Sequence, residues 1–366
     1  MVSKEVVGLI AAGGLSLAAF AQSAPRIAAI PGDPLELATG QIQVADASAG
    51  REAILQLLGR ARQSYALQSA GRAYDLKVSF TASSGGATDY DGAWQMEDVF
   101  DPQQGLRWTA QAAAGYTTTQ IFVNKTSYGD GTANIIPLRL QEARAALLDP
   151  LPSLANADRD LIRTSAATFN GAPVTCILLS GSRSAPTVTP GRRWEESEEC
   201  IDPQSGLLRV HSQVPGRYYA YDYSNAPQLG SCVMPRKVTV TEAGKIVSQI
   251  SVDSLKEISA ADPSLFVPTE AMKARGPAIA MGGALKISRF AGRGPFSSNV
   301  TVYPVCVFGL VTASGQLVEA HSLQPSDPNS PAAVEDVRRM SFPVLTTLKR
   351  RQQHFVFVIE KFVPSP

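Results

Sequence analysis

Two short motifs of nearly identical chemistry constrain this chain most. Residues 100–106 read FDPQQGL, and residues 201–207 read IDPQSGL. In each motif the aspartate can accept hydrogen bonds from the amides that follow, the proline fixes φ at the first corner, and the glycine accepts a positive φ at the exit. Such a motif joins two antiparallel strands in a tight hairpin. Residues 240–246, VTEAGKI, carry a third hairpin signal, so we expect an extensive antiparallel sheet.

Alternating runs flank these turns. Apolar and polar side chains alternate from residue 74 to residue 80, which is the period of a half-buried strand. Trp94 and Met96 alternate in the same way, as do Leu106 and Trp108. Further strands are predicted at residues 121–123, 173–180, 192–200, 207–213, 217–223, 236–241 and 246–252.

Three segments are predicted as helices before residue 170. In residues 50–70 the apolar side chains recur at steps of three and four, which places them on one face of a helix. Residues 137–148 are rich in leucine and alanine, and residues 158–167 are interpreted as another helix. Antiparallel strands combined with a few helices predict the α+β class.

The N-terminus has the pattern of a secretion signal. Lys4 precedes an apolar run over residues 6–20, and residues 19–21, AFA, fit the small-x-small cleavage rule. The run is shorter than the roughly 20 residues of a membrane span, although an uncleaved anchor is the alternative. We therefore expect a signal peptide over residues 1–21 and an exported protein, periplasmic or extracellular, with no transmembrane segment in the mature chain.

Export makes disulfide bonds possible. The chain has four cysteines, for which three pairings exist. Cys176 and Cys200 lie in successive predicted strands, and neighbouring antiparallel strands bring such positions close together, so we expect a Cys176–Cys200 disulfide. Cys232 and Cys306 are expected either to pair across a domain boundary or to be buried thiols.

Length and charge indicate more than one domain. A chain of 366 residues suggests two or three domains, and a segment rich in Pro, Ala and Gly at residues 262–283 predicts a boundary near residue 271. From there the chain has 11 Lys and Arg against 5 Asp and Glu, whereas the preceding part has a net charge of −5. The two parts either have separately solvated surfaces, or the basic part docks on an acidic partner or on the N-terminal part. The overall charge of +1 gives no indication of nucleic-acid binding.

Residues that could carry chemistry are isolated in the sequence. His211, His321 and His354 lack metal-ligand spacing and are interpreted as surface residues. The G-x-S-x-G elbow is absent, and Ser182 matches a nucleophile loop only loosely. The glutamates within residues 195–199 are interpreted as a solvated strand edge, with calcium binding as the alternative. We therefore predict no catalytic residue, no metal site and no cofactor, and we do not expect an enzyme.

The tyrosines between residues 218 and 223 form an aromatic stripe. Tyr219, Tyr221 and Tyr223 share one face of a predicted strand. They are interpreted as core or cross-strand packing, and ligand stacking is the alternative.

The order of elements up to residue 270 resembles the LolA-like family of envelope proteins. The likeness rests on a helix, a meander with the Asp-Pro-x-x-Gly hairpin, a helical insertion, and strands ending in residues 265–268, LFVP. Residues 169–176 and 200–208 carry most of it. The resemblance implies a half-open β-barrel with covering helices and an apolar inner face that accepts a lipid-like or lipoprotein ligand, because buried acyl CH₂ groups contribute about 0.8 kcal/mol each. The candidate lining residues are Tyr74, Leu76, Val78, Phe80, Trp94 and Trp108, which otherwise simply pack against the helix of residues 50–70 as core.

Residues 300–364 resemble the small C-terminal module of TonB-type energy transducers. The matching parts are residues 305–311, VCVFGLV, a turn at Gly315, a helix over residues 332–340, and a last strand over residues 355–362, FVFVIEKF. The family often has an aromatic residue where this chain has Met340. The resemblance implies a protein-contact module that adds its terminal strand to a partner sheet. Energy transduction is not expected, since the sequence shows neither a membrane anchor nor a long proline-rich segment.

Together these patterns predict a non-enzymatic exported envelope protein that binds a lipid-like or lipoprotein ligand in a half-barrel and contacts a protein through the C-terminal module. One alternative is a structural or protein-interaction component of an envelope transport complex without lipid binding, and a weaker one is a secreted hydrolase. The predicted organisation is a signal peptide (1–21), a linker (22–47), a LolA-like domain (48–270), a linker or extension (271–299) and a TonB-like domain (300–366).

Overall fold

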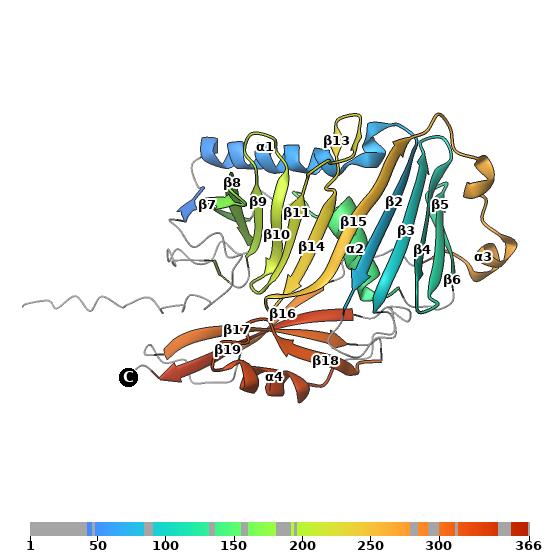
Figure 1. Ribbon diagram of the computed structural model, residues 1–366. Coiled ribbons are helices and arrows are strands. Elements are labelled where there is room, and N and C mark those ends of the chain that lie inside the picture. The colour runs from blue at the N-terminus through green and yellow to red at the C-terminus, as the bar shows by residue number, and fades with distance from the viewer. Residues whose placement is uncertain are drawn as a thin grey trace, which may run out of the picture.

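The computed structural model is dominated by one large antiparallel sheet of thirteen strands (Figure 1). The structure describes residues 42–45, 48–83, 91–131, 136–154, 160–180, 192–193, 196–278, 285–291, 300–311, 314–342 and 353–364. In spatial order the strands are β1 (Gln43–Val44), β7 (Leu161–Phe169), β8 (Ala172–Ser180), β9 (Ser197–Ile201), β10 (Leu208–Val214), β11 (Arg217–Asp222), β14 (Lys237–Glu242), β15 (Lys245–Glu257), β2 (Tyr74–Ala82), β3 (Gly92–Asp101), β4 (Gly105–Ala112), β5 (Thr117–Val123) and β6 (Thr126–Gly131).

The sheet consists of two meanders joined side by side and is not closed. Strands β2 to β6 follow one another in space as in sequence, and the later strands form the second meander. The two meet where β15 pairs with β2. Among the described residues, the outermost strands β1 and β6 pair only with β7 and β5 respectively. The result is a large open antiparallel sheet with few helices, as the sequence predicts.

The two Asp-Pro-x-x-Gly motifs form the predicted hairpins. In the β3–β4 turn, Asp101 accepts a hydrogen bond of 2.8 Å from the amide of Gln103. In the β9–β10 turn, Asp202 accepts one of 2.9 Å from the amide of Gln204. Gly206 takes a φ of +73°, which side chains with a Cβ rarely adopt. Local sequence alone therefore specifies these turns.

Two long helices cover one face of the sheet. Helix α1 (Ser48–Tyr65) runs across the strands near one end of the sheet, and α2 (Leu138–Leu148) lies behind β15 and β2 in the view of Figure 1. Apolar residues of both helices belong to the same buried cluster as side chains of β2, β3 and β4. The two helices predicted at residues 50–70 and 137–148 are confirmed. A short 3₁₀ helix, η1 (Leu67–Ala70), follows α1.

The helix predicted at residues 158–167 is wrong. This region contains strand β7, which pairs along its whole length with β8. Its β-branched residues Ile162, Thr164 and Thr168 favour extended backbone. The apolar residues in this region fit the spacing of a helix as well as that of a strand. Only the pairing with β8 distinguishes the two structures.

A second, four-stranded sheet lies against the opposite strand ends from α1 (Figure 1). Its order is β16 (Leu285–Ala291), β19 (Gln353–Pro364), β17 (Val300–Val311) and β18 (Leu317–Ser322), and α4 (Ser330–Arg338) packs on β17 and β18. We call these elements the C-terminal module. The strands and the helix predicted from residue 305 onward are confirmed, whereas β16 lies within residues 271–299, which were predicted as a linker or extension.

The terminal strand of this module is not available to a partner sheet. β19 pairs with β16 on one side and with β17 on the other. Both backbone edges are therefore used over residues 354–360, and the expectation that this part of the strand would extend a partner sheet is wrong. The sequence could not reveal this, because the parallel pairing of β16 with β19 joins segments about 70 residues apart.

The remaining elements are small. The 3₁₀ helix η2 (Pro263–Phe266) and helix α3 (Glu270–Arg275) cover the face opposite α1 and α2, near the ends of β3 to β6. β12 (Gln228–Leu229) and β13 (Cys232–Val233) form a two-stranded ribbon. The predicted signal peptide and Ser182 lie outside the described residues. Within the described part of the chain, no helix combines the length and the apolar character that crossing a membrane requires.

Candidate functional site

The six predicted ligand-lining residues lie on one face of adjacent strands. Phe80 stands opposite Trp94 and Val78 opposite Met96 in the register of β2 with β3. The rings of Phe80 and Trp94 are stacked with centroids 5.3 Å apart. Because directly opposed residues in a ladder point to the same side, these residues form a continuous apolar surface, which we call the inner face. Its predicted members are Tyr74, Leu76, Val78, Phe80, Trp94 and Trp108.

The inner face is covered by the chain itself. Its six predicted members are between 0 and 5 % exposed. They belong to one cluster with residues of α1 and with Leu140, Ala143 and Leu147 of α2. Nine of the eleven residues of α2 are buried, so this helix occupies the space in which a ligand of the inner face would lie.

Helix α2 is fixed to the inner face by a buried ion pair. Both terminal nitrogens of Arg144 donate to the carboxylate of Asp98 on β3, at 2.5 and 2.9 Å. The guanidinium lies 4.4 Å from the centre of the Trp108 ring, a cation–π geometry. A charged side chain thus covers one of the predicted lining residues, and the position of α2 depends on a pair whose disruption leaves a buried charge.

A second buried network holds the first turn of α2. Arg139 donates to Glu242 of β14 at 2.8 Å and to Glu142 of its own helix at 2.9 Å. Arg217 of β11 lies between the same two carboxylates, at 2.6 Å from Glu142 and 2.9 Å from Glu242. Burial raises the pKa of Glu242, but Arg139, His321 and Arg217 outweigh this effect and hold the pKa well below its ordinary range.

The C-terminal module completes this network. Nε2 of His321 on β18 lies 3.5 Å from Glu242, and its Nδ1 lies 3.1 Å from Glu319. Its ring stacks on Phe308 with centroids 4.9 Å apart. Burial lowers the pKa of His321, but its bonds to the two glutamates raise it to about 9. The interpretation of His321 as a solvated surface residue is therefore wrong: its side chain is 33 % exposed and joins the two parts of the molecule.

Apolar packing accompanies this contact. One buried cluster contains Leu138 of α2 and Val214 of β10 together with Phe308 and Leu323 of the module. Gly216, in the β10–β11 turn, has a φ of +85°, and a Cβ there would overlap the carbonyl oxygen of Leu323. The module thus docks on the N-terminal part, which was one of the two alternatives left by the charge distribution.

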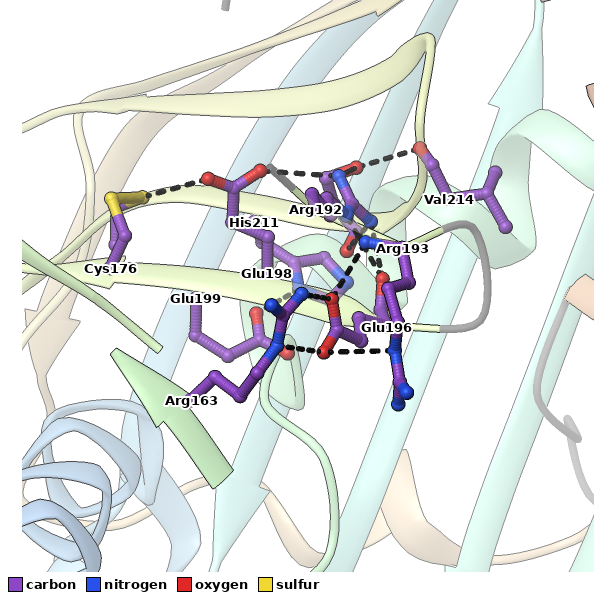
Figure 2. A network of polar contacts seen from close by, with 11 residues as sticks. Arg163, Cys176, Arg192, Arg193, Glu196, Glu198, Glu199, His211 and Val214 are labelled. Atoms are coloured by element: carbon purple, nitrogen blue, oxygen red, sulfur yellow. Dashed lines mark hydrogen bonds and ion pairs between the residues drawn. A yellow bond between two sulfur atoms is a disulfide. The ribbon is translucent and has the colours of Figure 1, made fainter. Parts of the chain in front are cut away.

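The three glutamates of this run that the structure describes do not form a solvated edge. Glu196, Glu198 and Glu199 are each 0 % exposed. Glu196 accepts hydrogen bonds from the side chain of Arg163 at 2.5 and 2.7 Å and from the amide of Arg193 at 2.7 Å (Figure 2). The interpretation failed because the pairing depends on the fold: Arg163 comes from the distant strand β7, and the chain folds back to place Arg193 on the carboxylate of Glu196 only three residues away.

Glu198 and Glu199 point to opposite faces of β9 and have separate partners. Arg192 lies 3.1 Å from Glu198 and also donates to the hydroxyl of Ser212 at 2.7 Å. Glu199 lies 2.6 Å from Nδ1 of His211 (Figure 2). His211 is buried, so its interpretation as a surface residue is wrong. These buried pairs tie β9 to the segments on either side of it.

The predicted Cys176–Cys200 disulfide is present. The two cysteines are directly opposed in the β8–β9 ladder, with Cα atoms 3.9 Å apart. The carboxylate of Glu198 is close enough to both sulfurs to form a ligand-like group with them, but a disulfide offers no thiolate to a metal. Cys232 and Cys306 are buried thiols, and burial raises the pKa of Cys306 to about 12.

The tyrosine row packs in the core. Tyr219 and Tyr221 are buried in the cluster that contains the inner face, and Tyr223 packs against it. Arg217 donates to the Tyr219 hydroxyl at 2.5 Å, and the hydroxyls of Tyr65 and Tyr223 are hydrogen-bonded. The interpretation as core packing is confirmed for this row.

The opposite side of β2 to β5, which we call the outer face, carries shallow grooves. One groove of about 550 Å³ and another of about 440 Å³ share Gln95 and Gln111 in their walls. A third, of about 600 Å³, lies between β5 and the η2–α3 segment. Their linings are mainly hydroxyl, amide and charged side chains, in contrast to the apolar inner face.

Sequence reasoning missed the buried arginines Arg139, Arg144 and Arg217. One signal was present: Arg139 and Glu142, three residues apart, flank one edge of the apolar side of α2, and Arg144 flanks the other. The partners Asp98 and Glu242 come from distant strands and are not identifiable from the sequence.

No protein-family model matches this chain, and no curated protein sequence does. Solved structures that align with this chain include the LolA superfamily protein NE2245 from Nitrosomonas europaea, with 9 % identity and a TM-score of 0.35 over 58 % of this chain and 97 % of that one. A putative outer membrane lipoprotein-sorting protein domain from Vibrio parahaemolyticus has 7 % identity and a TM-score of 0.33, over 59 % and 95 %. The MucA/MucB complex of Pseudomonas aeruginosa has 12 % identity and a TM-score of 0.26, over 73 % and 82 %. At this distance the similarities assign neither a ligand nor a partner to this chain.

Proposed function

We propose that this chain is a non-enzymatic, exported protein of the cell envelope that uses its large sheet to bind a ligand or a partner. The observation that carries the proposal is the open sheet, whose apolar inner face is covered by helices rather than by closure of its own strands. A helix is a replaceable cover, because it can be exchanged for another apolar body without breaking the strand ladder. Export and location in the envelope remain part of the proposal.

The ligand that best fits the inner face is an acyl chain of a lipid or a lipoprotein. The apolar surface runs without interruption across strands β2 to β5. This elongated shape suits an extended acyl chain better than a compact ligand. In the ladder, Leu106 and Phe122 extend the row that begins with Tyr74 and Phe100, and Phe122 is 47 % exposed. Burying an acyl chain contributes about 0.8 kcal/mol per CH₂ group. The ligand would take the place of Leu140, Ala143 and Leu147 of α2.

The second candidate is a protein-interaction component without lipid binding. The specific observation in its favour is that the inner face is filled while the outer face is hollowed by polar grooves. Hydroxyl and amide side chains such as Thr109, Gln95 and Gln111 can pair with the polar rim of a protein partner. This reading keeps α2 in place and uses the opposite side of the same strands.

One pair of variants separates the two candidates. Ala110 lies on the inner face and is buried, whereas its neighbour Gln111 lies on the outer face and lines the grooves. The mature protein, its Ala110→Phe variant and its Gln111→Phe variant are purified from the envelope and extracted with organic solvent for mass spectrometry. The acyl-chain proposal predicts co-purified lipid in wild type and Gln111→Phe, with at least a severalfold loss in Ala110→Phe, because the added ring fills the inner face.

A clean extract from all three proteins contradicts the acyl-chain proposal. If a specific partner is then retained by wild type and Ala110→Phe but lost by Gln111→Phe, the protein-interaction candidate is supported instead. Circular dichroism of each variant shows whether the sheet is intact before either result is interpreted.

A further inference from the structure

The first turn of α2 lies between the large sheet and the C-terminal module. On the sheet side, Arg139 pairs with Glu242 of β14. On the module side, Leu138 shares a buried cluster with Phe308 and Leu323, and the guanidinium of Arg139 lies 6.0 Å from the centre of the Phe308 ring. The same few residues of α2 are therefore held from both sides.

The module also contributes a cationic partner to the buried charges at the first turn of α2. Glu242 is 1 % exposed and is shared by Arg139, by Arg217 and by His321 of the module. Withdrawal of the module would remove His321 of β18 and Phe308 of β17 together and open Glu242 and Arg139 to water. Hydration of an ion pair weakens its attraction, because the effective dielectric constant rises. The anchor at the first turn of α2 would then weaken, leaving the Arg144–Asp98 pair at the other end.

We propose that the C-terminal module is a clamp that holds α2 on the inner face, so that undocking of the module releases α2 and opens the inner face to its ligand. This inference rests on the proposed function for the identity of the ligand, but the movement of α2 is independent of it. The module thereby regulates access to the inner face through α2.

Two glycines provide a matched pair of variants. Gly216 and Gly244 both lie in hairpin turns with positive φ, +85° and +76°. A Cβ at Gly216 would overlap Leu323 of the module, whereas a Cβ at Gly244 meets nothing within 4 Å. Gly216→Ala therefore combines backbone strain with a wedge against the module, and Gly244→Ala introduces the strain alone.

A second variant undocks the module by charge. His321→Glu places a carboxylate beside Glu242 and Glu319, where wild type has a histidine. Because the His321 side chain is 33 % exposed, the substitution does not require a new charge in a closed core. It separates the effect of the module from any strain in the β10–β11 turn.

The experiment measures amide hydrogen exchange of α2 and β18 in the full mature chain, together with uptake of the fluorescent fatty acid cis-parinaric acid. We expect exchange in both elements to increase by about tenfold or more in Gly216→Ala and in His321→Glu, with Gly244→Ala close to wild type. Fatty-acid uptake should increase in the same two variants.

Faster exchange in β18 with unchanged exchange in α2 overturns the clamp, because the module is then undocked while α2 stays in place. Faster exchange in α2 without uptake of fatty acid supports the clamp and contradicts the acyl-chain ligand. The two proposals can therefore fail separately.

Discussion

At the scale of single residues, this molecule depends on charges that are buried and paired. The arginines of α2 and β11 meet carboxylates of β3 and β14. Glu196, just before β9, meets Arg163 of β7, and Glu198 of β9 meets Arg192. Each pair is neutral as a unit but costly to break, since removal of one member leaves the other buried without compensation. Sequence patterns identify which residues are charged but not which are paired, and this is why the acidic run of β9 was misinterpreted as solvated.

Arg144→Ala should destabilise the protein by about 3–5 kcal/mol, because it leaves Asp98 buried and unpaired. The side chains of Arg144 and Asp98 are 9 and 1 % exposed. The control is Arg107→Ala, whose more exposed partner Glu97 lies 3.9 Å away, and which should cost at most about 1 kcal/mol. Urea unfolding of both variants measures the difference. Equal effects of the two substitutions would contradict the structural role given to the Arg144–Asp98 pair.

His321 predicts a specific dependence of stability on pH. Its pKa is raised from 6.5 to about 9 in the folded protein, so folding favours the protonated form. The stabilisation is complete below pH 6.5 and is lost as pH rises through 9. The groups facing His321 are Glu242 and Glu319, with Arg139 and Arg217 bound to Glu242.

The comparison for this prediction is His321→Gln, which cannot titrate. Between pH 6.5 and 9 the melting temperature of wild type should fall relative to that of the variant, and below pH 6.5 the difference should be constant. A difference that does not change with pH across this window would show that His321 is not held in its protonated form by the two glutamates.

At the scale of elements, the sequence predicts well those turns and helices that depend only on neighbouring residues. The hairpins at Asp101 and Asp202 follow from turn residues, and the helices α1 and α2 follow from spacing and composition. The region of β7 was predicted as a helix because its apolar residues fit both the helical and the strand period. Its pairing with β8 makes it a strand. The terminal strand β19 was misjudged for a related reason, since its neighbour β16 cannot be recognised as a partner without the fold.

The disulfide between Cys176 and Cys200 links strands β8 and β9 and was predicted correctly from the sequence. It closes a loop with a sequence separation of 24 residues, for which the chain-entropy model gives a stabilisation of about 3 kcal/mol. Cys176→Ser/Cys200→Ser should therefore lower the free energy of unfolding by about that amount. Treatment of wild type with a reductant under denaturing conditions should produce the same loss.

The matched control for this prediction is Cys232→Ser, a buried cysteine that is not in a disulfide. Because the Cys176–Cys200 disulfide is intact in this variant, reductant should lower its free energy of unfolding by the same amount as in wild type. If reductant does not change the free energy of unfolding of wild type, the disulfide between β8 and β9 has no stabilising role.

At the scale of the whole molecule, the open antiparallel sheet and its covering helices were predictable, and so was the set of residues that forms the inner face. What the sequence did not provide is how that face is covered. Arg144 lies over Trp108, and the C-terminal module fixes α2 through Leu138 and Glu242. These contacts join segments far apart in the chain, and their consequence is that ligand binding at the inner face requires α2 to move.

The most direct test of this account locates a bound acyl chain relative to the tryptophans. The chain has three tryptophans, and Trp194→Phe leaves only Trp94 and Trp108, both on the inner face. Binding of 9,10-dibromostearic acid, followed independently by calorimetry, should quench most of the remaining tryptophan emission, since bromine quenches only at short range. Saturable binding that leaves this emission unchanged, or no binding at all, would contradict the inner face as the ligand site.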